Sequence, residues 1–156
     1  MCGYGRVGRH LVDALQRRAI PTVIIEYNPT VVADLRRQGL PAIFGDASNP
    51  EVLQSARLGD AHLVAALVPD ASTTQMIVTR ARRANRRVHI IARARDAEQI
   101  ARLRHDGANS VVQPEFEAGV EVIRYALRRY GVYESELDHT IMGRRRAFYQ
   151  DEGEET

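Results

Sequence analysis

Six residues at the start of the chain, Gly3-Tyr4-Gly5-Arg6-Val7-Gly8, follow the pattern G-x-G-x-x-G and lead into an amphipathic helix. In this pattern one glycine permits a tight turn, one lets backbone N–H groups approach a phosphate, and one lets the helix pack closely against a sheet. The amino end of the helix presents the positive end of its dipole to the same anion. The motif therefore predicts a loop that binds the phosphates of a nucleotide.

Two acidic residues support this interpretation. Glu26 ends an apolar run 18 residues after Gly8, where a carboxylate would accept hydrogen bonds from both ribose hydroxyls and repel a 2′-phosphate. The alternative for Glu26 is a solvated acid at a strand end. Gly45-Asp46-Ala47 follows a second apolar run, and Asp46 is equally well explained as a ligand contact or as a turn residue that caps the next helix. The predicted ligand is NAD(H) or AMP, ADP or ATP.

Short apolar runs alternate strictly with helical patterns along the chain. We expect strands at 22–26, 42–44, 62–67, 88–92 and 110–112. We expect helices at 7–18, 28–38, 50–58, 70–84, 96–106 and 115–130. This alternation predicts an α/β fold with a Rossmann-like, doubly wound parallel sheet in the strand order 3-2-1-4-5-6.

One element of that fold is largely missing from the sequence. A strand should precede the glycine motif, yet only Met1 and Cys2 stand before Gly3. A sheet without its central strand leaves backbone groups of two neighbouring strands unpaired. We therefore expect lowered stability unless another segment fills the gap.

The carboxyl-terminal part of the chain is predicted to be helical. The helix at 115–130 has one apolar stripe, formed by Phe116, Val120, Ile123 and Leu127. A second set of residues widens this stripe: Val122, Tyr125 and Ala126. A helix that covers only its own sheet needs one stripe, so we expect a crossover helix that pairs with a second copy of the chain; the alternative is burial under the tail. In the tail, Leu137, Ile141 and Phe148 recur at helical spacing, and the acidic end is predicted to be disordered. We place the nucleotide-binding domain at 1–131 and the helical tail at 132–156.

Composition excludes several classes of function. All 22 basic residues are arginine, so neither a Schiff-base lysine nor a Walker lysine exists. The histidines are scattered, and no metal site is expected. Acids are distributed among the arginines and the net charge is +2, which argues against nucleic-acid binding. The single cysteine, Cys2, excludes an internal disulfide framework and is expected to be a small buried thiol.

Four further residues complete the predicted nucleotide site. Arg6 and Val7 stand at the start of the first helix, Leu67 ends the strand expected at 62–67, and Arg93 ends the strand expected at 88–92. An arginine at this edge could neutralise a phosphate or a second anionic ligand; the alternative is pairing with a local acid. No acid–base pair suited to catalysis stands out.

Several of these segments together resemble a known family. They are the opening Cys2–Arg9, Glu26-Tyr27-Asn28-Pro29, Gly45-Asp46-Ala47 and the run 90–96. They are similar to the regulator-of-potassium-conductance (RCK, TrkA-N) domain, and most similar to the cytoplasmic C-terminal region of KefB/KefC-type cation:proton antiporters.

The resemblance implies a regulatory domain at the inner face of the cell membrane. Such a domain binds NAD(H) or AMP-like nucleotides, forms a homodimer through its crossover helix, and regulates potassium or proton transport by an attached membrane protein. The resemblance assigns Gly3, Gly5 and Gly8 to the phosphate turn, Glu26 to the ribose, Asp46 and Ala47 to the adenosine, and Arg6 and Arg93 to phosphate or a glutathione-like effector. It implies no enzymatic activity.

Two other functions compete with this one. A small NAD-dependent oxidoreductase would need a substrate pocket with a proton donor beside the nicotinamide, and no segment is left to build it. A truncated module that dimerises without binding nucleotide is the second alternative.

Overall fold

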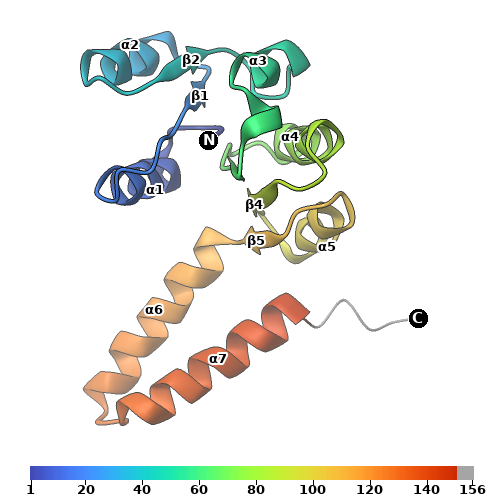
Figure 1. Cartoon of the computed structure of the whole chain (residues 1–156). Helices are drawn as coiled ribbons and strands as arrows, with labels where there is room; N and C mark the ends of the chain where they lie inside the picture. The colour runs from blue at the N-terminus through green and yellow to red at the C-terminus, as the bar shows by residue number, and fades with distance from the viewer. Residues whose placement is uncertain (151–156) are drawn as a thin grey trace.

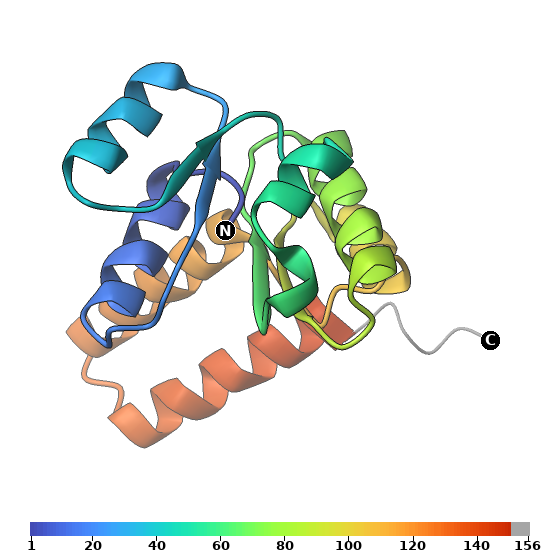
Figure 2. The same ribbon diagram turned by 45° about the horizontal axis from the view of Figure 1, so that its top comes forward.

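The computed structural model of the chain describes residues 1–150. The strands are β1 (Ile24–Glu26), β2 (Ala42–Phe44), β3 (Leu63–Ala66), β4 (His89–Arg93) and β5 (Ser110–Val112). The helices are α1 (Arg6–Gln16), α2 (Pro29–Arg37), α3 (Pro50–Ser55), the short 3-10 helix η1 (Leu58–Asp60), α4 (Ala71–Ala84), α5 (Ala97–His105), α6 (Pro114–Arg129) and α7 (Glu134–Gln150). Helices α1 and α2 lie on one side of the strands, and α3, α4 and α5 lie on the other (Figure 1 and Figure 2). The expected α/β architecture is confirmed.

Side-chain caps explain where several helices begin. The Asn28 side chain accepts hydrogen bonds from the N–H groups of Thr30 and Val31 at the start of α2, and Pro29 occupies the first helical position. Asn49 caps α3, and Asp96 caps α5 in the same way. Each cap satisfies backbone donors that have no partner inside the helix, so the helix starts were readable from the sequence.

At the centre of the sheet the first strand is largely missing, as expected, and a single bridged residue stands in its place. Cys2 forms parallel bridges to both Ile25 and Ala66. Its N–H donates to the Ala65 carbonyl at 2.8 Å, and its own carbonyl accepts from Leu67 at 2.9 Å. One extended residue thus pairs with a neighbour on each side, because an extended chain directs backbone groups to both edges. It links the β1–β2 sheet to the β3–β4–β5 sheet, all parallel.

The bridge is short, and an apolar groove continues along the same line beyond Met1. It measures about 450 Å³ and lies between β1 and β3, with α1 and α3 on its two sides. Leu15, Val23 and Leu63 are among its lining residues. The consequence of the short first strand is therefore confined to the amino-terminal end of the sheet. Lowered stability stays a prediction.

The core is built from the inward faces of these elements. Ile77 of α4, Ile90 of β4 and Leu103 of α5 are fully buried. Cys2 is 1% exposed within the same cluster, and its burial raises the pKa of the thiol. The expectation of a small buried thiol is confirmed. A buried neutral thiol is a poor nucleophile.

Helices α6 and α7 form a hairpin that projects from β5 (Figure 1). Leu137 and Ile141 of α7 are buried, and the ring of Phe148 stacks on that of Phe116 with centroids 3.9 Å apart. The expected helical tail is therefore present, and it covers one side of α6, which is the burial under the tail considered as an alternative. The acidic segment expected to be disordered, 151–156, lies outside the described residues.

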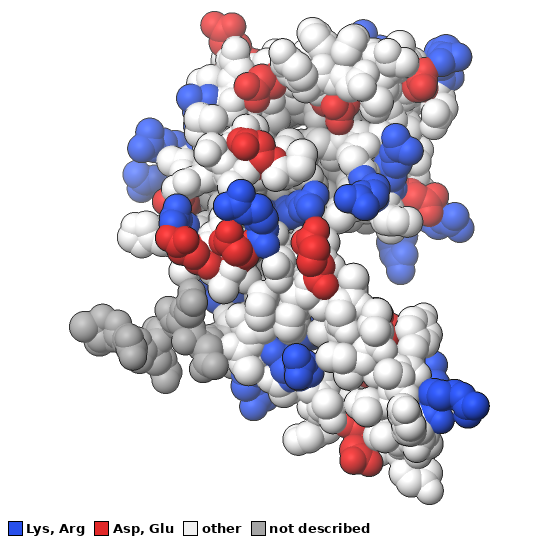
Figure 3. All heavy atoms as spheres, turned by 180° about the vertical axis from the view of Figure 1, so that it is seen from behind, with Lys and Arg blue, Asp and Glu red and all other residues white. Residues whose placement is uncertain are grey.

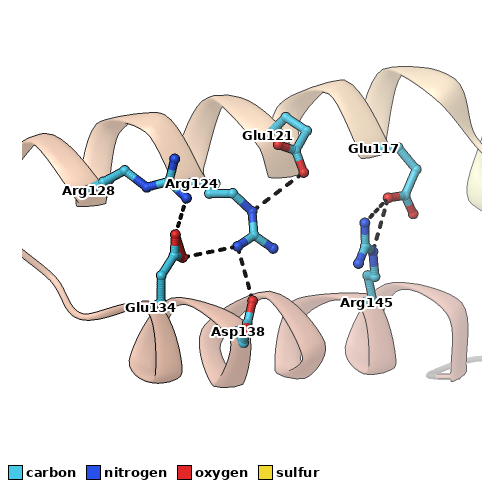
Figure 4. A network of polar contacts seen from close by, with 7 residues as sticks. All are labelled: Glu117, Glu121, Arg124, Arg128, Glu134, Asp138 and Arg145. Atoms are coloured by element: carbon cyan, nitrogen blue, oxygen red, sulfur yellow. Dashed lines mark hydrogen bonds and ion pairs between the residues drawn. The ribbon is translucent and has the colours of Figure 1, made fainter.

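Ion pairs connect the two helices of the hairpin (Figure 4). Arg124 of α6 lies 3.0 Å from the carboxylate of Asp138 and 3.4 Å from that of Glu134, both on α7. Arg145 of α7 pairs with Glu117 of α6 at 2.6 Å. Exposed pairs contribute little singly, so the buried apolar residues supply most of the stabilisation and the charges fix the register.

We expect Leu137→Ala to lower the free energy of unfolding by about 2–5 kcal/mol, because it leaves a cavity under α7. Met142→Ala on the same helix is the control, since Met142 is 61% exposed. Denaturant unfolding measures both variants. Equal effects of the two substitutions would show that α7 does not pack on the domain as described.

Candidate functional site

A cavity of about 750 Å³ lies at the carboxyl ends of β1, β2, β3 and β4. Ligands bind at this edge in doubly wound folds. Ten of the eleven predicted nucleotide-binding residues line it: Gly3, Gly5, Arg6, Val7, Glu26, Gly45, Asp46, Ala47, Leu67 and Arg93. The exception, Gly8, lies behind the loop. Residues far apart in the sequence therefore meet where the motifs predicted.

The three glycines of the motif have distinct surroundings. Gly3 has a φ of +91°, and a Cβ there would lie 3.1 Å from Val68 Cγ1. A Cβ on Gly8 would lie 2.3 Å from the Gly3 carbonyl oxygen, so only glycine lets α1 pack this closely against the loop. A Cβ on Gly5 would meet nothing within 4 Å. Gly5 is therefore required by neither backbone conformation nor protein packing.

The first turn of α1 offers backbone donors to the cavity. Gly5 is its N-cap and supplies no side-chain acceptor, unlike the caps of α2, α3, α4 and α5. The first N–H groups of a helix have no partner within the helix. An anion at this position would accept those hydrogen bonds and interact favourably with the helix dipole.

Glu26 braces the glycine loop against the end of β1. Its Oε2 accepts a hydrogen bond from the Tyr4 N–H at 2.7 Å, and its Oε1 accepts one from the Asn28 N–H at 2.9 Å. A carboxylate has about four lone-pair directions, so both oxygens can still accept from hydroxyls. Glu26 is therefore not merely a solvated acid at a strand end, because its hydrogen bonds connect the glycine loop to β1.

Asp46 is a turn residue, but it does not cap the next helix. Its Oδ1 accepts a hydrogen bond from the Ser48 N–H at 2.7 Å, as a turn residue does. Asn49, not Asp46, caps α3. Asp46 also lines the cavity, so its turn role holds the carboxylate at the cavity wall.

The arginines at this edge differ in their partners. Arg93 lies 3.3 Å from the Glu115 carboxylate, which is the local pairing considered as an alternative. Arg6 takes part in no ion pair within residues 1–150 and is exposed. Arg9 places its guanidinium 5.5 Å from the centre of the Tyr4 ring. Arg6 is thus the arginine in the cavity wall best able to accept a new anion.

Sequence reasoning missed several residues of the cavity wall, including Tyr4, Tyr27, Asp70 and Thr73. Asp70 caps α4, and hydrogen bonds from the hydroxyl and N–H of Thr73 lower the pKa of its carboxyl. The signal was available, because Asp70 follows β3 as Glu26 ends β1. The exposed ring of Tyr27 stacks on Phe44 with centroids 6.0 Å apart, a pairing between strands that periodicity does not reveal.

The distribution of charge on the molecular surface bears on whether the chain binds a nucleic acid. On the face shown in Figure 3, acidic and basic side chains are interspersed without a continuous basic stripe. No helix within residues 1–150 combines the length and apolar character needed to cross a lipid bilayer.

Comparison with known proteins identifies the family. The sequence matches the TrkA-N domain over residues 1–114. It is 39% identical over 117 residues to the putative cation/proton antiporter YbaL of Escherichia coli K12. The aligned region covers 75% of this chain and 21% of that protein. The chain therefore spans about a fifth of the length of this relative.

Solved structures agree with the fold. The crystal structure of the TrkA-N domain of the inner membrane protein YbaL from Escherichia coli has a TM-score of 0.77 and 37% identity, covering 80% of this chain and 92% of that one. The Shewanella denitrificans Kef C-terminal domain in its AMP-bound form has a TM-score of 0.82, covering 96% and 93%. At 20% identity, the second likeness concerns the fold alone. The family expected from the motifs is confirmed: the chain belongs to the TrkA-N domain family.

Proposed function

We propose that this chain is a nucleotide-sensing regulatory domain of a potassium or cation:proton transport protein, with its nucleotide-binding unit at 1–131 and a helical tail at 132–156. The observation that carries the proposal is the convergence of the glycine loop, the uncapped start of α1 and the Glu26 carboxylate on one cavity. Those groups suit a phosphate and a sugar held side by side. The membership in the TrkA-N family supports the same conclusion.

The proposed ligand is NAD(H) or AMP, ADP or ATP. The cavity of about 750 Å³ falls in the usual size range of small-molecule sites. Glu26 would hold the ribose hydroxyls and disfavour a 2′-phosphate. Arg6 and the first N–H groups of α1 would hold the phosphates. The structural neighbour in its AMP-bound form is consistent with this class of ligand. An anionic effector such as glutathione, bound beside Arg93, is a further element of the proposal.

Regulation would work through a difference in affinity. A nucleotide that binds one arrangement of the regulatory domain better than another shifts the equilibrium between them. The attached membrane protein would respond to that shift at the inner face of the cell membrane. No bond of the nucleotide needs to break, so we propose no enzymatic activity for this domain.

We propose that α6 forms the dimer contact. One side of α6 is covered by α7, but Val122 and Tyr125 are each 66% exposed. Apolar side chains grouped on one helix face commonly mark a protein contact. A second copy of the chain placed against this face would bury them.

The oxidoreductase alternative requires a proton donor beside the nicotinamide. Tyr4 and Tyr27 line the cavity, whereas its lining within the described chain contains neither histidine nor cysteine. Incubation with NADH and candidate carbonyl substrates tests this alternative directly, because steady consumption of NADH would contradict a purely regulatory role.

Isothermal titration calorimetry with AMP, ATP, NAD⁺ and NADH tests the proposal. We expect binding of at least one nucleotide, and Glu26→Gln to weaken it about tenfold or more, since hydrogen bonds to a charged group contribute about 1.5–3 kcal/mol. The same variant should lose discrimination against NADP⁺. Glu136→Gln, at an exposed position of α7, is the control. Unchanged affinity and selectivity in the Glu26 variant would overturn the ribose assignment.

Gly5→Ala separates binding from folding. A Cβ at Gly5 meets no protein atom within 4 Å but would occupy space that a phosphate needs. We expect nearly unchanged stability and at least tenfold weaker nucleotide binding, because the phosphate could no longer reach the N–H groups. Gly59→Ala is matched to it, since that Cβ also meets nothing within 4 Å. Thermal unfolding and calorimetry on both variants check the prediction; normal binding by the Gly5 variant would contradict it.

Tyr125→Asp tests the dimer. A carboxylate on the exposed face of α6 would have to be desolvated in the contact, so we expect a shift from dimer to monomer in analytical ultracentrifugation. Tyr133→Asp is the control, because Tyr133 is 79% exposed between α6 and α7. A monomeric wild-type chain, or dissociation of both variants alike, would count against α6 as the interface.

A further inference from the structure

One stretch of the chain is strongly basic. Between Ala71 and Arg95 there are seven arginines and neither Asp nor Glu. Five of the seven stand close together at Arg80, Arg82, Arg83, Arg86 and Arg87, at the end of α4 and in the turn that leads to β4. This concentration of charge is not used by the proposed nucleotide site.

The fold places these arginines at the edge of the sheet opposite the cavity. Helices of a parallel sheet run antiparallel to the strands, so their carboxyl ends lie where the strands begin. The first residue before α4, Asp70, lines the cavity. A helix of 14 residues is about 21 Å long at 1.5 Å per residue. The basic end of α4 is therefore well separated from the nucleotide.

Hydrogen bonds made by Asn85 bring a further arginine, Arg57, to the same surface. The side-chain amide of Asn85 donates to the carbonyls of Gly59 at 3.0 Å and Ala61 at 3.1 Å. These hydrogen bonds hold the turn after α4 against the loop that contains Arg57. Arg57 and Arg80 also line one shallow pocket. We name the group Arg57, Arg80, Arg83, Arg86 and Arg87 the basic edge.

The basic edge is not consumed by internal contacts. None of the ion pairs formed within residues 1–150 includes any of its five arginines. Arg82, by contrast, is structural, since its guanidinium donates to the carbonyl of Gly107 and to the side chain of Asn109. Favourable interaction with a helix dipole accounts for basic residues in the last turn of α4. It does not account for Arg86 and Arg87, which lie beyond the helix.

Acids near the basic edge leave it positive. Asp60 lines the same shallow pocket as Arg57 and Arg80. Asp106 lies at the end of α5, where its carboxylate accepts a hydrogen bond from Gln75 at 2.8 Å. Two carboxylates do not balance five arginines, so the surface retains an excess of positive charge that an anionic partner would neutralise.

We propose that the basic edge binds anionic phospholipid headgroups at the surface of a bilayer. Arginine grips phosphate through a fork of N–H donors, and clustered basic residues beside a membrane attract its anionic leaflet. The choice of a membrane rests on the proposed role beside a transport protein. A single-stranded nucleic acid would also require aromatic side chains for stacking, and the basic edge contains none. In this orientation the nucleotide cavity faces away from the bilayer and stays open to solvent.

Co-sedimentation with lipid vesicles tests the proposal. The probes are vesicles of phosphatidylcholine alone and vesicles in which about one third of the lipid is phosphatidylglycerol, the anionic component that a basic cluster attracts. We expect binding to the anionic vesicles only, and weaker binding as salt is raised, since salt screens exposed charges. The triple substitution Arg83→Gln, Arg86→Gln and Arg87→Gln should weaken this binding at least about tenfold. Lysine at the same three positions should largely restore it.

A matched control separates the basic edge from net charge. Arg129, Arg144 and Arg146 are exposed on the α6–α7 hairpin, and their replacement by glutamine removes the same charge. We expect this control to keep vesicle binding. Equal loss in both triple variants, equal binding to neutral vesicles, or tighter binding to duplex DNA than to anionic vesicles would each overturn the proposal.

Two further measurements keep the outcome unambiguous. Circular dichroism and thermal unfolding establish that the triple variants are folded. Nucleotide calorimetry on the same proteins should be unchanged, because the basic edge lies at the opposite side of the sheet from the cavity. Failure of vesicle binding with intact nucleotide binding refutes only the membrane contact. Absence of nucleotide binding by the wild-type chain, with vesicle binding intact, refutes the nucleotide site and leaves the membrane contact standing.

Discussion

Five hydrogen bonds made by main-chain atoms of Met1, Cys2 and Gly3 hold the two halves of the sheet together. They also fix where the glycine loop begins, because Gly3 donates to Ile25 at 2.9 Å directly before the turn. Glu26 then braces that turn from the next residue of β1. The architecture of the cavity thus depends on three residues that would be too few to form a strand by themselves. They suffice because Met1 and Gly3 hydrogen-bond to Ile25 of β1, whereas Cys2 hydrogen-bonds to Ala65 and Leu67 on the β3 side.

The hairpin of α6 and α7 follows a different physical principle. It extends away from the sheet (Figure 1), so it has to supply its own apolar contacts, and Phe116 and Phe148 stack for that reason. The hydroxyl of Tyr149 connects it to the sheet region, since it accepts from the Gln113 N–H and donates to Glu117, each at 3.1 Å. A structural change at the end of β5 would therefore reach the hairpin through these two hydrogen bonds. This arrangement suits a domain that transmits the state of its cavity to a partner.

Local signals carried most of the fold. The strands at 42–44 and 110–112 match β2 and β5 residue for residue, because short apolar runs bounded by Gly, Asp or Pro leave little freedom. Asparagine followed by proline marked the starts of α2 and α3 for the same reason. The structure places most predicted site residues around one cavity, since parallel strands bring their carboxyl ends to a common edge. What could not be predicted depends on long-range geometry: the double pairing of Cys2 and the hydrogen bond from Tyr4 to Glu26.

The narrow link at Cys2 has a consequence for any molecule that enters the cavity. Glu26 and Asp46 belong to one half of the sheet, while Leu67, Asp70 and Arg93 belong to the other. A ligand touching both walls would act as a clamp across the thinnest part of the protein. Its binding would then stabilise the folded chain by an amount that grows with the logarithm of the ligand concentration above Kd. Resistance to unfolding would therefore rise with occupancy of the cavity, because the ligand would reinforce the sheet at its single-residue link.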